Sequence, residues 1–165
     1  EGKPVWQLLN LKEPKPTTTA YTISLSNPAK MMQDAKSKSD YPILKIKLGG
    51  QDDEKCIKAV REGSPNSRII VDANEGWNIE SYNYLVPIFK SIGVELIEQP
   101  FPSNKDHLLK NLDRKIPICA DESCHDVKSL EKLMGLYDYI NIKLDKTGGL
   151  TEAINLLKAA KKKRI

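Results

Sequence analysis

The sequence predicts an α/β fold, a TIM-type barrel in which this chain forms about six βα units of a larger (β/α)7β barrel. From residue 20 onward, short β-branched apolar runs alternate with longer stretches of helical period, as βα units around a parallel sheet require. An eight-unit barrel needs roughly 250 residues. This chain has 165, and its last helical pattern runs into "KKKRI" without a stop signal. We therefore expect an incomplete barrel.

Each expected strand is a short apolar run rich in β-branched residues. The six runs span residues 20–25, 43–48, 68–72, 95–99, 117–122 and 139–145. Because neighbouring parallel strands need a crossover connection, each gap between them should hold a helix. Strand and helix are thus expected to alternate up to the end of the chain.

Polar cap residues mark where the helices should begin. Ser26 or Asn27 precedes Pro28, and proline suits a first helical turn because an N–H there has no partner within the helix. The other expected caps are Asn78, Ser103, Asp126 and Thr151.

Glycine and proline mark the expected ends and interruptions of helices. Gly63 and Gly93 stand where two helices should stop. Pro87 interrupts a third helical pattern, which predicts a kink or a displaced start. Before the first strand, "PVWQLL" (4–9) fits a short helix and "KEPKPTTT" (12–19) fits a linker.

Composition and charge narrow the classes of function. Lysine and arginine number 26 against 22 acidic residues, and much of this excess lies in the last five residues. A charge excess so small and local does not predict nucleic-acid binding. The three cysteines lack close CxxC spacing, and no apolar N-terminal segment suggests secretion or a membrane span. We expect a cytoplasmic protein that binds neither nucleic acid nor membranes.

Five charged residues recur at the carboxyl ends of successive expected strands, 22 to 26 residues apart. They are Lys47, Asp72, Glu98, Asp121 and Lys143. In a parallel barrel these strand ends line one mouth, where the active sites of this architecture lie. The spacing therefore predicts that three carboxylates converge between two lysines.

Three carboxylates in a poorly hydrated mouth repel one another unless they share protons or bind a cation. Ligands that are all oxygen favour a hard divalent ion, with Mg²⁺ as the usual occupant and Mn²⁺ as the alternative. The sequence therefore predicts a metal site that acts as a Lewis acid.

The strand at 43–48 carries two lysines in an apolar run. Lys45 and Lys47 are two residues apart, so they point to the same side, here the barrel interior, while Leu44, Ile46 and Leu48 pack outward against helices. A lysine beside a second cation releases its proton more readily, as a general base must. With Lys143 across the mouth, one group can remove a proton from a carbon and the other can return one.

With these residues assembled, the chain resembles the barrel domain of the enolase superfamily, in its muconate lactonizing subgroup, and within it the dipeptide epimerases of the L-Ala-D/L-Glu type. The matching stretches are "LKIKLG", "VDANEGW", "ELIEQPF", "ICADES" and "INIKLDKTGGL". They occur in the family's order and at its spacing, and they cover about residues 5–162.

The resemblance implies a Mg²⁺-dependent isomerase, an epimerase or racemase that removes and returns the α-proton of a carboxylate substrate. The substrate would be a dipeptide such as L-Ala-L-Glu, and the reaction would pass through a metal-stabilised ene-diolate. In this resemblance Asp72, Glu98 and Asp121 bind the metal, and Lys47 and Lys143 are the acid–base pair.

The resemblance also assigns the residues around these groups. Lys45 would neutralise the substrate carboxylate, and Thr22 would contact the substrate. Asn74 and Gln99 would lie behind the metal ligands.

Parts of the family's pattern are missing. Residues 1–19 match only the end of the family's capping region and a linker, and residues 20–165 match barrel strands 1 to 6. The rest of the N-terminal capping domain and strands 7 and 8 are absent, so this stretch alone is expected to be inactive. Its open sheet edges predict association, and a homo-oligomer is therefore among the expected partners.

Other functions stay open at this point. An o-succinylbenzoate synthase, an N-acylamino acid racemase or a cycloisomerase of the same subgroup would use the same metal and could use the same lysines. A different class is a truncated, non-catalytic scaffold that keeps the barrel strands.

Overall fold

The computed structural model describes residues 2–165, so Glu1 of the expected 1–19 segment lies outside the described residues. Six parallel strands form one sheet whose spatial order, β1 to β6, is also their order in the sequence. The strands are β1 (Tyr21–Ile23), β2 (Ile43–Lys47), β3 (Arg68–Asp72), β4 (Val94–Glu98), β5 (Ile118–Ala120) and β6 (Tyr139–Ile140). This order is that of a barrel wall, and it confirms the predicted fold class.

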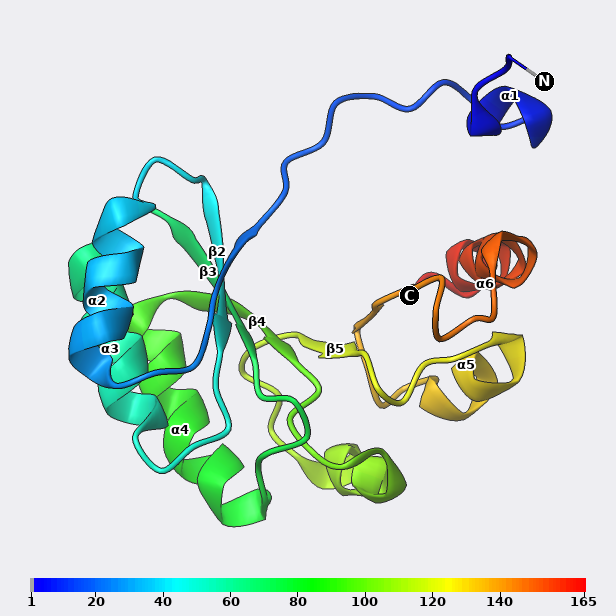
Figure 1. Ribbon diagram of the computed structural model, residues 1–165. Helices are drawn as coiled ribbons and strands as arrows, with labels where there is room; N and C mark the ends of the chain where they lie inside the picture. Colours follow the sequence, from blue (N-terminus) through cyan, green and yellow to red (C-terminus); the bar gives the residue numbers. More distant parts are fainter. Residues whose placement is uncertain (1) are drawn as a thin grey trace.

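Helices fill the connections between the strands. They are α1 (Val5–Leu8), α2 (Pro28–Ser37), α3 (Asp53–Gly63), α4 (Ile79–Ile92), the 3-10 helix η1 (Ser103–Asn111), α5 (Val127–Leu133) and α6 (Leu150–Lys163). Figure 1 shows α2, α3 and α4 side by side along one face of the strands, with α5 and α6 beyond β5. The N-terminal segment that carries α1 extends away from the sheet (Figure 1).

Strand β2 shows how the sheet separates its two faces. Leu44 and Ile46 are fully buried, whereas Lys45 and Lys47, which alternate with them, lie on the opposite face and are only partly buried. The apolar face packs against the helices, so the lysines face the barrel interior, as the sequence predicts.

Three predicted helix caps are confirmed. The Asn27 side chain accepts a hydrogen bond from the Lys30 N–H, Asn78 accepts one from Ser81, and Asp126 forms a capping box with Ser129. These bonds satisfy backbone donors that have no partner inside the helix.

Two other predicted caps are wrong. Residues 103–111 form a 3-10 helix preceded by Pro102, and α6 begins at Leu150 after Gly149, not after Thr151. No described side chain caps either start. The polar residues predict that a helical element begins in each place, but they put its first residue one or two positions too late.

The predicted helix stops are found, for different reasons. Gly93 follows α4 with φ +84°, the left-handed conformation that glycine adopts most easily. Helix α3 ends at Gly63, where a Cβ atom would collide with the Met32 carbonyl of α2. Helix α4 starts directly after Asn78 and continues through Pro87, so the predicted displaced start is wrong.

A buried carboxylate fastens the loop between β2 and α3. Asp53 accepts hydrogen bonds from the Gly49 N–H at 3.0 Å, from the Gly50 N–H at 2.9 Å and from Trp77 Nε1 at 2.8 Å. Gly49 has φ +117°, and a Cβ there would lie 2.8 Å from the Ala73 carbonyl oxygen. The loops after β2 and β3 therefore touch through their backbones, which brings the two strand ends together.

Replacing Asp53 by alanine is expected to lower the free energy of unfolding by about 3 kcal/mol, because the buried Trp77 indole N–H and two partly buried backbone N–H groups lose their acceptor. Urea denaturation followed by circular dichroism would measure the loss. The control is Asp52→Ala, since this exposed neighbour pairs only with Lys55 among the described residues and should cost about 0.5 kcal/mol or less. Equal losses for the two variants would contradict the account of this loop.

Candidate metal and proton-transfer site

Three carboxylates meet at the carboxyl end of the sheet. Asp72 ends β3, Glu98 ends β4 and Asp121 directly follows β5. Their exposed fractions are 0%, 5% and 2%, and one oxygen from each lies within 4.8 Å of the others. Buried oxygen ligands this close together fit a hard divalent cation, because their mutual repulsion disfavours leaving all three charged and unpaired.

The three lysines that the sequence singles out contact these carboxylates. Lys45 Nζ lies 2.8 Å from Asp72 Oδ2 and 2.7 Å from Glu98 Oε2. Lys47 Nζ lies 2.7 Å from Asp72 Oδ2, and Lys143 Nζ contacts Asp121 Oδ2. The five charges predicted from strand spacing are therefore brought together, and Lys45 joins them as a sixth.

Strands β5 and β6 are shorter than the runs predicted at 117–122 and 139–145, and this changes where two of these residues lie. β5 ends at Ala120 and β6 at Ile140, so Asp121 and Lys143 lie in the loops beyond the paired residues. Their side chains still reach the same point. Loops carry functional groups in many folds of this architecture.

The pKa shifts differ among the charged groups. Burial, together with the charge of Asp72, raises the pKa of Glu98 despite its bonds to Lys45 and Asn141. Burial also acts on Asp121, but hydrogen bonds from Lys143 and Lys146 outweigh it and lower the pKa of Asp121. For Lys45 and Lys143, burial opposes the charge, but bonds to the carboxylates outweigh it and raise the pKa of both lysines.

Because the pKa of Glu98 is raised, its negative charge should lower the free energy of unfolding of the metal-free protein at neutral pH. Since the folded state favours the protonated form, stability is lost as pH rises from the unfolded pKa through the folded one. Glu98→Gln should therefore raise the melting temperature in EDTA at pH 7 by roughly a few degrees. The difference should vanish below the ordinary glutamate pKa. A variant that melts lower than wild type at pH 7 would contradict this sign.

Asn74 and Gln99 lie directly behind the carboxylates. The Asn74 N–H donates to Asp72 Oδ1 at 3.0 Å, and its side-chain oxygen accepts from Lys47 at 2.9 Å. The fully buried Gln99 accepts the Asp121 N–H at 2.9 Å through its side-chain oxygen. Asn74 therefore fixes the Asp72 carboxylate, and Gln99 fixes the backbone that carries Asp121.

Thr22 lies at the edge of this cluster. It pairs with Lys45 in the register of β1 and β2, so both side chains lie on the same face of the sheet. Thr22 is exposed, and no described residue joins it to the carboxylates by a hydrogen bond. A molecule that contacts Lys45 could therefore reach Thr22 as well.

Sequence reasoning missed two residues of the cluster. Asn141 Nδ2 donates to Glu98 Oε1 at 3.0 Å, and Lys146 Nζ lies 2.6 Å from Asp121 Oδ1. Asn141 precedes Lys143 by two residues, and this spacing could have indicated a shared face. Lys146 had no such signal, because it approaches Asp121 through the fold of the loop before α6.

Comparison with known proteins identifies a family and relatives that match most of the chain. A family model described as enolase C-terminal domain-like matches residues 28–165. Over 97% of its length the chain is 41% identical to N-acetyl-D-glutamate racemase from a Pseudoalteromonas species, and over 93% it is 38% identical to L-Ala-D/L-Glu epimerase from Escherichia coli. The chain spans about half the length of these curated relatives, 50% and 49%.

Solved structures show the same relationship. An enolase family member from Agrobacterium tumefaciens, with bound sodium and L-Ala-L-Glu, is 45% identical with a TM-score of 0.90. The match covers 95% of this chain and 48% of that one. A dipeptide epimerase from Cytophaga hutchinsonii, complexed with Mg and D-Ala-L-Val, is 32% identical with a TM-score of 0.89, over 96% of this chain and 46% of that one.

Proposed function

Because the chain belongs to the enolase C-terminal domain-like family, we propose that the protein is a Mg²⁺-dependent epimerase acting at the α-carbon of an N-acylated amino acid. The observation that carries this proposal is the buried carboxylate triad with Lys47 and Lys143 beside it. A site of this kind suits removal and return of a proton next to a carboxylate.

Asp72, Glu98 and Asp121 would hold the ion, with Mn²⁺ as an alternative to Mg²⁺. When bound, the ion would supply a Lewis acid that stabilises negative charge on the substrate carboxylate. The Cytophaga structure complexed with Mg and a dipeptide supports this assignment.

The three lysines would have two roles, substrate binding and proton transfer. Lys45 is mostly buried between two carboxylates and would hold the substrate carboxylate by its charge. Lys47 and Lys143 have side chains that are 33% and 40% exposed, so a substrate can reach both. One would take the α-proton and the other would deliver a proton to the opposite face. Thr22, on the same face as Lys45, would contact the bound substrate.

The names of the relatives support a substrate class. N-acetyl-D-glutamate and the glutamate of an L-Ala-Glu dipeptide are both glutamates with an acylated amino group. We therefore favour an N-acylated glutamate, with L-Ala-L-Glu first. N-acetylglutamate racemisation is the second candidate, since the relative of that name is 41% identical.

Other parts of the interpretation stay predictions. They are the division into a capping-region end (1–19) and a partial barrel (20–165), a homo-oligomer, and a cytoplasmic location. Across residues 2–165, no helix is both long and apolar enough to cross a membrane.

Proton NMR in D₂O with Mg²⁺ would test the proposed function on the longest natural form of the protein. L-Ala-L-Glu should lose its glutamate α-proton signal while the diastereomer appears, and N-acetylglutamate should react more slowly. Formation of an alkene or a lactone from other carboxylates would favour a synthase or a cycloisomerase. A protein that binds Mg²⁺ but leaves every α-proton in place would contradict the proposal, and one that binds no metal would favour the scaffold.

A further inference from the structure

Each of the three carboxylates has one oxygen paired with a lysine of the mouth and the other held by a separate donor. The oxygens that pair with Lys45, Lys47 or Lys143 are Asp72 Oδ2, Glu98 Oε2 and Asp121 Oδ2. The remaining oxygens accept from the Asn74 N–H, Asn141 Nδ2 and Lys146 Nζ. Each carboxylate is thus fixed from behind, which determines the oxygen that faces the mouth.

Lys146 differs from Lys143 although both ammonium groups touch Asp121. The Lys146 side chain is 12% exposed, and its Nζ contacts three acceptors: Asp121 Oδ1, the Asp121 carbonyl and the Asn141 carbonyl. Lys143 is 40% exposed and, among described residues, donates only to Asp121 Oδ2. An ammonium has three N–H donors. Lys146 therefore has none left for a substrate, whereas Lys143 does.

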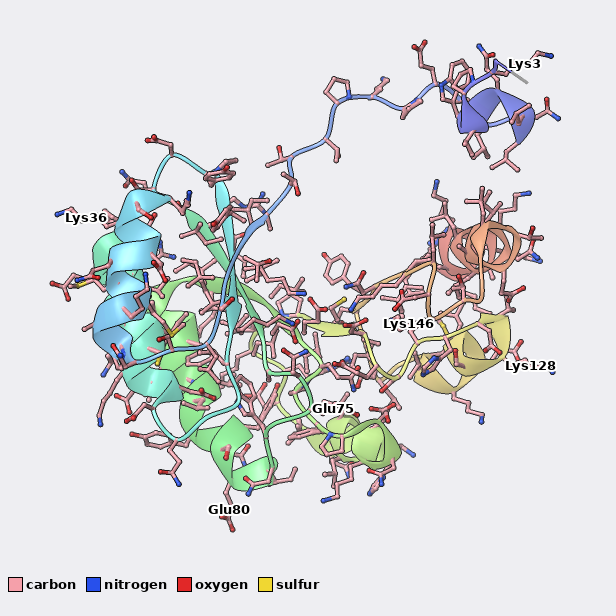
Figure 2. The ribbon with its side chains drawn as sticks, in the orientation of Figure 1. Lys3, Lys36, Glu75, Glu80, Lys128 and Lys146 are labelled. Carbon is pink, nitrogen blue, oxygen red and sulfur yellow. The ribbon has the colours of Figure 1, made fainter. Side chains whose placement is uncertain are left out.

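The acceptors of Lys146 lie on two neighbouring strand ends. Asp121 follows β5 and Asn141 follows β6, and the last backbone bond between these strands runs from the Asn141 N–H to the Ala120 carbonyl at 2.7 Å. Lys146 extends this connection beyond the paired residues. Figure 2 shows it between the sheet and helices α5 and α6.

We propose that Lys146 is a positioning residue that locks the ends of β5 and β6 together and turns Asp121 Oδ2 toward the mouth beside Lys143. The inference rests on the proposed function, because it treats Asp121 as a metal ligand. Lys146 would act through Asp121 and would not exchange a proton with the substrate.

This role and a simple charge effect predict opposite results for metal binding. A cation next to a metal ligand repels a divalent ion, so removing its charge alone would tighten Mg²⁺ binding. Removing a group that orients a ligand typically weakens metal binding about 10- to 100-fold. The sign of the change therefore separates the two explanations.

The test is isothermal titration of metal-stripped protein with Mg²⁺ alone, in the longest natural form of the protein. Lys146→Met keeps the aliphatic stem and should weaken Mg²⁺ binding about 10- to 100-fold. Lys128→Met is the matched control: Lys128 and Lys146 line one surface pocket beside the start of α5, and within residues 2–165 no hydrogen bond or ion pair joins Lys128 to the carboxylates. This control should bind Mg²⁺ as the wild type does.

Lys146→Gln keeps an amide donor and should lose less affinity than Lys146→Met, but still at least about threefold. If circular dichroism shows that the methionine variant does not fold, the test rests on the glutamine variant alone, and a loss of Mg²⁺ affinity of at least about threefold supports the inference. Affinity equal to or tighter than wild type in a folded Lys146 variant would overturn this inference and leave the proposed function standing. Wild-type protein that binds no Mg²⁺ would overturn both.

Discussion

Lys47→Ala is expected to lower the rate of epimerisation by about 10³-fold, because general acid–base groups typically contribute 10²- to 10⁴-fold. Lys143→Ala should have a similar effect. Each variant removes a side chain that is at least one-third exposed, so the fold should survive the change. Steady-state turnover of L-Ala-L-Glu would measure both losses.

The two lysine variants should also differ from each other. With one base removed, the other can still exchange the α-proton of the enantiomer that it deprotonates. Lys47→Ala and Lys143→Ala should therefore keep solvent exchange for opposite enantiomers at the reacting carbon. Lys55→Ala, an exposed lysine on α3, is the control and should leave turnover unchanged. A Lys47→Ala protein with more than about a tenth of wild-type turnover would contradict the assignment of the base.

Asp72→Asn is expected to abolish stabilisation by Mg²⁺ and to reduce turnover to the background rate. In the wild type, a free Mg²⁺ concentration 100 times the dissociation constant should stabilise the fold by about 2.7 kcal/mol. The amide removes a charge from a fully buried residue of the proposed metal site, which also pairs with Lys45 and Lys47. Differential scanning calorimetry with EDTA and with millimolar Mg²⁺ would measure the effect.

Asp34→Asn provides the control for this experiment. Asp34 is partly exposed on α2, pairs with Lys30 and is not one of the three carboxylates that could hold a metal ion. Its variant should gain as much stability from Mg²⁺ as the wild type. A rise in melting temperature with Mg²⁺ that persists in Asp72→Asn would show that the ion binds elsewhere, and the proposed metal site would be wrong.

The order of strands and helices could be predicted from the sequence because apolar period and cap residues are local signals. Asn27, Asn78 and Asp126 cap the helices that the sequence predicts. The lengths of β5 and β6 could not be predicted this way. The stretches predicted as strands, 117–122 and 139–145, continue past Ala120 and Ile140, whereas backbone pairing, which depends on the neighbouring strand, ends earlier.

The five charged residues of the site could be predicted because each βα unit returns the chain to the same end of the sheet. Their spacing along the sequence therefore reports their height in the barrel. Lys146 and Asn141 were not predicted, because their contacts depend on how the chain after β6 folds against the ends of neighbouring strands. Which oxygen of each carboxylate faces the mouth is likewise a tertiary property.

The most direct test of a two-lysine mechanism is the isotope content of the product at early times. Wild-type protein with Mg²⁺ would convert L-Ala-L-Glu in D₂O, and mass spectrometry would follow substrate and product separately. A mechanism with two bases predicts a product that carries one deuterium at the reacting carbon from the first turnovers, because the second lysine has exchanged with D₂O and delivers a deuteron. A product that keeps the substrate's own hydrogen would contradict the account, because a single group would then have moved the proton from one face to the other.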